Sequence, residues 1–397
     1  MRVTPAAELH HRHVQMQKYM AEEGLDAAIC VQNADLFYFT GTVQSGCFYL
    51  PACGPAIYMV RRDIGRARSE SLLQEIIPFN SFKDIPRILA EYSYPQPTRI
   101  GMELDVVPVN FFERYRDLFP AAVFKDVTPL IRRVRMIKSS YELQIMQEAA
   151  GQVDRVFRRA IEVIREGITD LELASELEFT ARRLGHLGFT RMRLFNGEML
   201  FGHAFSGSDS ALPAYTDTPF GGAGPAPSFG QGAGFKIIGR NEPIVVDFAG
   251  SLDGYLVDQT RVLAIGGLPD RLRRGYDDMC TVQERMKALA PERPTWGALY
   301  EECWSLALSL GYADQFMGAK GSQVSFIGHG IGVELDEYPF IARGQDRMVL
   351  EPGMAFAFEP KLVFTGEGAV GIENSFYLDG DGALRQLTLS PEELVIL

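Results

Sequence analysis

The residues of this chain most able to do chemistry are acids that stand in or beside apolar runs. Asp247 ends the run Ile244 to Val246, and Asp258 stands in the middle of a second apolar segment, Tyr255 to Val262. Aspartate is a poor strand residue, and a buried carboxylate is destabilising unless it is paired or bound to a metal ion. A structural alternative is an ion pair between Asp258 and Arg261, with Asp247 at a strand end. The local pattern alone favours neither reading.

Two glutamates and a histidine further along the chain extend this set. Glu359 ends the alternating apolar stretch in LEPGMAFAFEP, Glu373 stands within GAVGIENSFYL, and His329 follows the apolar VSFI. Each glutamate alone is explained by a salt bridge. Together, four acids and one imidazole in apolar strands form a consistent ligand set for one or two divalent ions such as Mn²⁺, Co²⁺, Fe²⁺ or Zn²⁺.

The elements that must position these residues fall into two regions. The first ~130 residues alternate a helical stretch ending at Glu23-Gly24 with the strand-like DAAICV, LFYFTG, GPAIYMV and TRIGMEL, which is typical of an α/β domain. Ser139 and Glu142 then form a capping box that opens a long helix. Its predicted buried face consists of Leu143, Met146, Ala150, Val153 and Phe157. We therefore predict one domain over residues 1–135 and a second over 138–397.

The second domain contains a weak internal repeat. TDLELASELEFTARRLG from Thr169 and TWGALYEECWSLALSLG from Thr295 each follow another helix and precede strand-like segments. This order predicts two similar α-plus-β halves with a cleft between them. The Gly/Pro-rich TPFGGAGPAPSFGQGAGFK between the halves lacks the preceding strand and following helix of a dinucleotide loop, so we interpret it as a flexible loop over the cleft.

Composition excludes several function classes. Lys and Arg number 39 against 51 Asp and Glu, a net charge of −12, and no basic run suits a phosphate backbone, so nucleic acid is not an expected partner. The N-terminus lacks the apolar core of a signal peptide, and no segment approaches the ~18 apolar residues of a membrane span. Five scattered cysteines without a C-x-x-C pair indicate reduced thiols in a cytoplasmic protein. His10, His11 and His13 are expected to be solvated on a polar helix face.

In order along the chain, the two aspartates eleven positions apart, the GHGIG histidine, the EPG…EP glutamate and the IE glutamate resemble the pita-bread metallohydrolases. That family includes methionine aminopeptidase, aminopeptidase P, prolidase and creatinase. NADLFYFTG and RMIKSSYELQIMQEAA also resemble the creatinase-type N-terminal domain and the start of the catalytic domain. The resemblance implies an α/β creatinase-like N-terminal domain, an α+β pita-bread catalytic domain with a pseudo-twofold repeat, and a homodimer.

The resemblance also implies a centre of two divalent ions, Mn²⁺ or Co²⁺ first, with Zn²⁺ or Fe²⁺ as alternatives. Asp258 and Glu373 would bridge the ions, Asp247 would hold one, and His329 and Glu359 the other. A hydroxide on such a centre attacks an amide carbonyl at neutral pH. Glu359 would also pass a proton to the leaving amine. The implied activity is that of an Xaa-Pro aminopeptidase or prolidase acting on short peptides.

Three positions depart from the peptidase pattern. Ala214 stands where prolidase-like members have histidine after proline, Asp336 stands where a second histidine contacts the substrate, and Gly371 replaces a common arginine. An ionised aspartate cannot donate a hydrogen bond to a developing oxyanion, whereas imidazole can. His203 is a candidate replacement, although a structural role on a strand is the favoured reading of this residue.

Asp336 therefore has three readings: a solvated turn residue, a partner that orients His329, or a substrate contact that selects a cationic group. Glu359, His203 and Asp336 are the candidate catalytic residues. The departures keep open a small-molecule C–N hydrolase or C–S lyase on the same fold, of the creatinase or dimethylsulfoniopropionate lyase type. A non-catalytic binding protein is a third hypothesis. The complete set of five candidate ligands counts against it, because non-catalytic members of the fold typically lose ligands.

Overall fold

A computed structural model of the chain describes residues 2–397. They form two compact units, the first reaching Arg135 and including Arg193–Asn196, the second comprising Met136–Met192 and Gly197–Leu397. The segment Arg193–Asn196 lies within the predicted second domain, and Arg193 pairs with Asp35 and Asp105 of the first unit. In residues 2–397, no helix is both long and apolar enough to cross a bilayer.

The first unit is built on a six-stranded mixed sheet of order β4-β3-β2-β1-β5-β6. Its short strands alternate with helices, as the α/β pattern predicts, and enclose an apolar core that includes Ile29, Ile57 and Ile100. The elements are α1 (Ala6–Glu22), β1 (Ala27–Cys30), α2 (Asn33–Thr40), β2 (Gly46–Pro51), β3 (Ile57–Val60), α3 (Ile64–Glu70), β4 (Ile76–Pro78), the 3₁₀ turn Phe82–Asp84, α4 (Ile85–Glu91), β5 (Arg99–Met102), α5 (Val109–Leu118), β6 (Val123–Asp126) and α6 (Thr128–Arg135).

Two expectations about the first unit are wrong. LFYFTG is helical, because the Gln32 side chain accepts hydrogen bonds from the first backbone N–H groups of α2 and Gly41 ends the helix in the left-handed conformation. The apolar run is buried nearly all round, which hides helical periodicity. His13 is buried, not solvated, and its Nε2 lies 2.7 Å from the Phe39 carbonyl oxygen.

The second unit contains a four-stranded sheet of order β17-β9-β8-β7, a five-stranded sheet of order β11-β10-β12-β15-β16, and the pair β13-β14. Its elements are α7 (Ser140–Val163), α8 (Asp170–Arg183), β7 (Gly202–Ser206), the 3₁₀ turn Gly207–Ala211, β8 (Ile244–Leu252), β9 (Tyr255–Ala264), α9 (Asp270–Leu289), the 3₁₀ turn Ala290–Glu292, α10 (Trp296–Ser309), β10 (Phe326–Ile331), β11 (Leu335–Ala342), β12 (Ala355–Phe358), β13 (Lys361–Phe364), β14 (Gly368–Gly371), β15 (Asn374–Leu378), β16 (Leu384–Gln386) and β17 (Val395–Ile396).

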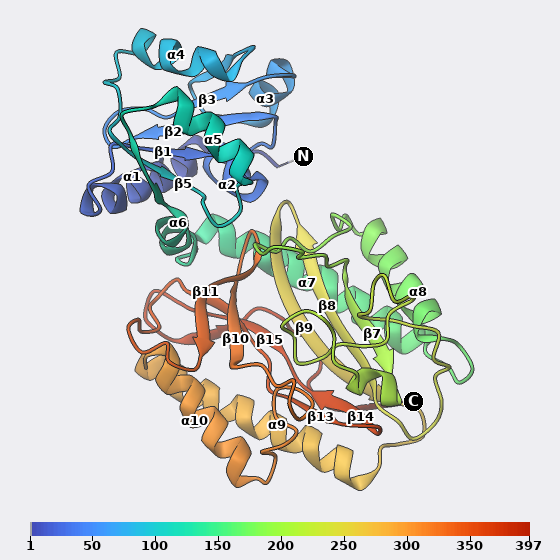
Figure 1. Cartoon of the computed structure of the whole chain (residues 1–397). Coiled ribbons are helices and arrows are strands. Elements are labelled where there is room, and N and C mark those ends of the chain that lie inside the picture. Colours follow the sequence, from blue (N-terminus) through green and yellow to red (C-terminus); the bar gives the residue numbers. More distant parts are fainter. Residues whose placement is uncertain (1) are drawn as a thin grey trace. The chain divides into compact units, whose positions relative to one another are not determined.

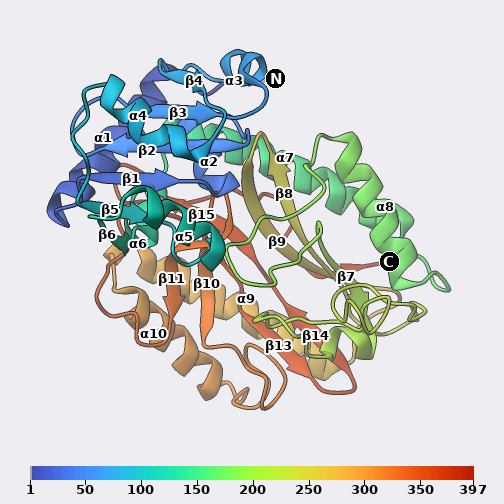
Figure 2. The ribbon, with the colours of Figure 1, turned by 45° about the horizontal axis from the view of Figure 1, so that its top comes forward.

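Each half of this unit begins with a packed pair of helices. Helices α7 and α8 pair and α7 covers β8 and β9, whereas α9 and α10 pair and lie against β14 and β11 (Figures 1 and 2). The predicted capping box of Ser139 and Glu142 opens α7, and Thr169 and Thr295 cap α8 and α10 in the same way, each accepting a backbone N–H. The predicted order of helices followed by strands is therefore present twice.

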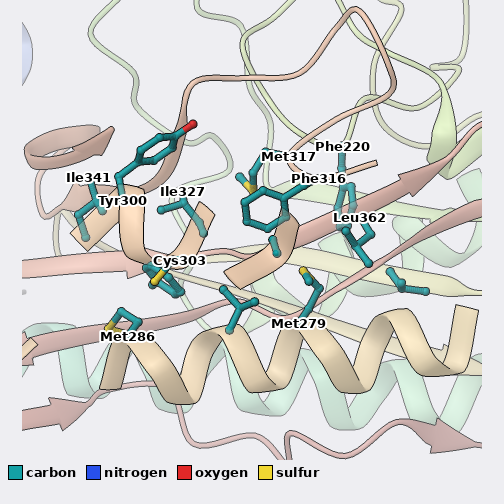
Figure 3. Close-up of a cluster of buried hydrophobic side chains, with 14 of the residues drawn as sticks. Phe220, Met279, Met286, Tyr300, Cys303, Phe316, Met317, Ile327, Ile341 and Leu362 are labelled. Atoms are coloured by element: carbon teal, nitrogen blue, oxygen red, sulfur yellow. The ribbon is translucent and has the colours of Figure 1, made fainter. Parts of the chain in front are cut away.

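A large apolar core packs α9 and α10 against the strands of the second half. Met279 and Met286 of α9, Cys303 of α10 and Leu362 of β13 lie together in it (Figure 3). Phe220, from the Gly/Pro-rich loop, is also fully buried in this core. That loop is irregular in backbone, but part of it is packed rather than free.

Candidate metal centre

The five candidate ligands come together around one small cavity, of about 50 Å³, in the second unit. Asp247 lies on β8 and Asp258 on β9, which pair antiparallel so that Ala249 faces Asp258. Alternate residues share a face, so Asp247 and Asp258 are diagonal neighbours on one side of the sheet. The second half repeats this geometry, because His329 of β10 faces Ala357 of β12, two residues before Glu359. Glu373 joins the two halves through its bridge to Thr260.

Three of these residues have the arrangement of a metal site. Asp258, His329 and Glu373 are buried, and one ligand atom from each lies within 4.8 Å of the others. Glu373 Oε1 is buried and accepts no hydrogen bond within residues 2–397, with His329 Nε2 3.8 Å away. An oxygen without a partner at this depth is costly, and a divalent cation held by two carboxylates and an imidazole satisfies it. These residues therefore fit one divalent ion.

The alternative ion pair between Asp258 and Arg261 is not formed. The Arg261 guanidinium donates to the carbonyl oxygens of residues 260, 373, 390 and 391 and to the side-chain oxygen of Asn374. These contacts use its donors and tie β9 to the end of the chain. Asp258 is left to the acid cluster.

Burial and mutual repulsion oppose the ionisation of all the carboxylates of the cluster at once. Burial raises the pKa of Asp258 well above its usual range, and nearby carboxylates raise it further. Burial also raises the pKa of Glu359 to about 7. Burial alone would lower the pKa of His329, but the contact with Glu373 and the surrounding carboxylates raise it to about 10. A bound cation supplies the charge that these groups otherwise take up as protons.

Lys361 is a site residue that the sequence analysis missed. Its Nζ lies 2.7 Å from Glu359 Oε2, 2.9 Å from Glu373 Oε2 and 3.0 Å from Asp247 Oδ2. Burial alone would lower the pKa of this ammonium, but the three carboxylates raise it well above its usual value. The signal in the sequence was a lysine in a buried apolar strand two residues after Glu359, a spacing that directs alternate side chains to one side.

His203 lies on β7 directly opposite Asp247 and lines the cavity. Its ring is buried, and Nε2 has no hydrogen-bond partner within the described chain. Burial lowers its pKa, so the imidazole is neutral at neutral pH. A neutral imidazole with an unused ring nitrogen at a cavity wall is able to bind a ligand atom.

Asp336 also lines the cavity, where its side chain remains one-third exposed. Its Oδ1 lies 3.6 Å from His329 Nδ1, whereas the Gly330 carbonyl oxygen lies closer to that nitrogen, at 3.2 Å. The backbone carbonyl is thus the nearer partner of the ring. The adjacent Glu337 is held by Lys138 at 2.9 Å and accepts two backbone N–H groups of the same turn, which fixes the position of Asp336.

The other two departures lie in different surroundings. Ala214 lines a neighbouring cavity with Tyr215 and Gln323 and is not among the residues around the acids. Gly371 lies opposite Lys361 on the paired strands β13 and β14. Gly371, which stands where related peptidases commonly have arginine, is therefore the cross-strand neighbour of Lys361.

Comparisons with known proteins identify the family and the fold. Residues 144–379 match the family model described as "Metallopeptidase family M24", and residues 12–137 match the "Creatinase/Prolidase N-terminal domain". An Xaa-Pro dipeptidase of Pyrococcus furiosus is 26% identical over 389 residues, covering 98% of this chain and 100% of that protein. The uncharacterized peptidase YqhT of Bacillus subtilis is 29% identical over 303 residues, 75% of each chain. The solved structure of an Xaa-Pro dipeptidase from Bacillus anthracis shares the fold, with a TM-score of 0.81 at 24% identity, over 98% of this chain and 100% of that chain.

Proposed function

This chain belongs to metallopeptidase family M24 and is a metal-dependent hydrolase, and from that premise we propose that it cleaves short peptides, with Xaa-Pro dipeptides as the first candidates. The observation that carries the proposal is the buried group of Asp258, His329 and Glu373, with its unpaired glutamate oxygen inside a cavity. The named relatives favour a peptidase over a small-molecule hydrolase or lyase.

A divalent ion at this group, when bound, polarises an amide carbonyl and lowers the pKa of bound water. The protein side chains have separate tasks. Glu359 lines the cavity beside this group, where its carboxylate would pass a proton to the leaving amine. His203 presents an unused ring nitrogen to the cavity, where it is able to hydrogen-bond the substrate.

The test is a peptide panel with the purified full chain, supplied separately with Mn²⁺, Co²⁺, Zn²⁺ and Fe²⁺. Release of the N-terminal residue from Leu-Pro and Ala-Pro, faster than from Leu-Ala, is the expected result. Asp258→Asn should abolish release, while Glu166→Gln, which changes an exposed acid 3.9 Å from Arg240, should not alter it. No turnover of any di- or tripeptide with any of the four metals would overturn the proposal.

The finer expectations from the resemblance belong to the same proposal: Mn²⁺ or Co²⁺ as the native metal, a homodimer and a cytoplasmic location. Five cysteines without a disulfide in the described chain are compatible with a reducing compartment. Metal analysis of protein isolated without added metal and light scattering in solution test the first two directly.

A further inference from the structure

Lys361 contacts three of the five candidate ligands, and two of them, Asp247 and Glu373, are those that the resemblance gives to one of the two ions. The lysine Nζ donates to Asp247, Glu359 and Glu373 at 2.7–3.0 Å. In the arrangement implied by the family resemblance, Asp247 and Glu373 hold one ion together. In this protein Asp247 and Glu373 each accept a hydrogen bond from the Lys361 ammonium.

Packing around the lysine stem limits where the ammonium can lie. Lys361 is 2% exposed, and its Nζ lies 4.8 Å from the centre of the buried Phe220 ring. Its stem passes over Gly371, where an added Cβ would stand 2.8 Å from Lys361 Cγ. Leu362, the next residue, is fully buried in the core. The lysine is therefore held between these packed residues and the cavity, which it lines together with the acids.

The positive charge of Lys361 opposes the binding of a second divalent ion beside it. The ammonium carries one positive charge and donates one hydrogen bond to each of the three carboxylates. One oxygen of each carboxylate is therefore already engaged. A divalent ion on the same oxygens would lie within a few ångströms of that ammonium, and like charges at such separation repel strongly in a buried site. Glu373 Oε1, in contrast, lies on the side of His329, 3.8 Å from its Nε2, and accepts no hydrogen bond within the described residues.

We propose that the Lys361 ammonium takes the place of one of the two metal ions, so that the protein binds a single divalent ion per chain at Asp258, His329 and Glu373. Asp247 then forms an ion pair with Lys361 and does not bind the metal ion. The inference rests on the metal centre of the proposed function and deepens it. It also accounts for Gly371, because the small residue leaves room for the lysine stem.

Metal stoichiometry tests the inference without any reference to activity. The full chain is stripped with a chelator, loaded with excess Mn²⁺, passed over a desalting column and analysed by elemental mass spectrometry. About one ion per chain is expected for the wild type and about two for Lys361→Ala, because removal of the ammonium frees three carboxylates. The matched control is Lys236→Ala, which removes a partly buried lysine that pairs with Glu242 away from the acids. It should remain at about one.

The number of ions bound by the wild type distinguishes the single-ion inference from the metal centre itself. About two ions in the wild type would overturn the substitution by Lys361 while leaving the proposed hydrolase intact. No bound ion in the wild type would overturn the metal centre itself. If Lys361→Ala does not fold, the Mn²⁺ electron spin resonance spectrum of the wild type still decides: isolated ions support the inference, and a spin-coupled pair contradicts it.

Discussion

Lys361 lies opposite Gly371 on the β13–β14 pair, and a Cβ atom added to Gly371 would stand 2.8 Å from both Cα and Cγ of the lysine and 2.6 Å from the Pro360 carbonyl oxygen. Two of these three atoms belong to the backbone, so relief requires movement of the strand. Gly371→Ala should therefore lower the free energy of unfolding by about 2 kcal/mol, the usual effect of overpacking. Chemical denaturation with the midpoint and slope fitted together measures it.

Gly230→Ala is the control for that experiment, because no atom lies within 4 Å of its added Cβ and its φ is not positive. It should leave stability almost unchanged. Equal stability of Gly371→Ala and the wild type would show that the strand gives way easily, and that the lysine is less confined than the packing indicates.

His203 is expected to contact the substrate through its unpaired Nε2. His203→Phe keeps an aromatic ring beside Phe205, whose ring centre lies 5.5 Å away, but removes the hydrogen-bonding nitrogen. We expect kcat to fall about 100-fold, comparable with the loss of one oxyanion-stabilising group, with little change in Tm. Steady-state kinetics and a thermal melt measure the two quantities. Unchanged kcat with a lowered Tm would assign the histidine a structural role only.

Asp336 is expected to bind a cationic group of the substrate, because the Gly330 carbonyl oxygen is the nearer partner of the His329 ring. Asp336→Asn should raise KM for dipeptides with a free amino terminus about tenfold, the order of one charge-assisted hydrogen bond. Bound metal should stay constant. N-acetylated peptides serve as the matched control and should respond less. Loss of metal in this variant would instead assign Asp336 to the orientation of His329.

Metal removal should destabilise the folded protein, since an ion that binds the folded chain and not the unfolded one adds to stability. At about 100 times its dissociation constant such an ion contributes about 2.7 kcal/mol. Addition of a chelator should therefore lower Tm by several degrees, and excess Mn²⁺ should restore it. Differential scanning calorimetry measures the shift. Asp258→Asn should melt at the same temperature with and without chelator, and a full shift in this variant would place the ion elsewhere.

Acid should weaken the second unit through His186. Burial lowers the pKa of this imidazole to about 4, against the raising effect of its contact with the Ala249 carbonyl oxygen. Its Nδ1 accepts the Gly188 N–H, which only the neutral ring allows. Between pH 6.5 and 4 the unfolded chain binds the extra proton, so stability is full above about 6.5 and falls by up to about 3 kcal/mol as pH decreases to 4.

Urea unfolding at several pH values compares the wild type with His186→Gln. The variant should be less stable at neutral pH, because it loses the Gly188 contact, but its stability should depend on pH by about one proton less over this range. His13, whose pKa burial also lowers to about 4, titrates equally in both proteins and cancels in the comparison. Parallel curves would contradict the assignment to His186.

The amino-acid sequence by itself determined the family, the fold class and the order of the elements around the acids. Such features depend on neighbours in the chain or on the order of residue types along it: the capping box of Ser139 and Glu142 closes within one helical turn, and the four acids and the histidine indicate a metal site when taken together. The tertiary structure decided what these residues contact. It buried the LFYFTG helix on nearly all sides, engaged Arg261 with backbone carbonyl oxygens rather than with Asp258, and brought the ammonium of Lys361 to Asp247. Lys361 and Asp247 are 114 positions apart in the chain. They meet because the pairing of distant strands, which local periodicity does not reveal, decides which buried charges lie together in a site of low dielectric constant.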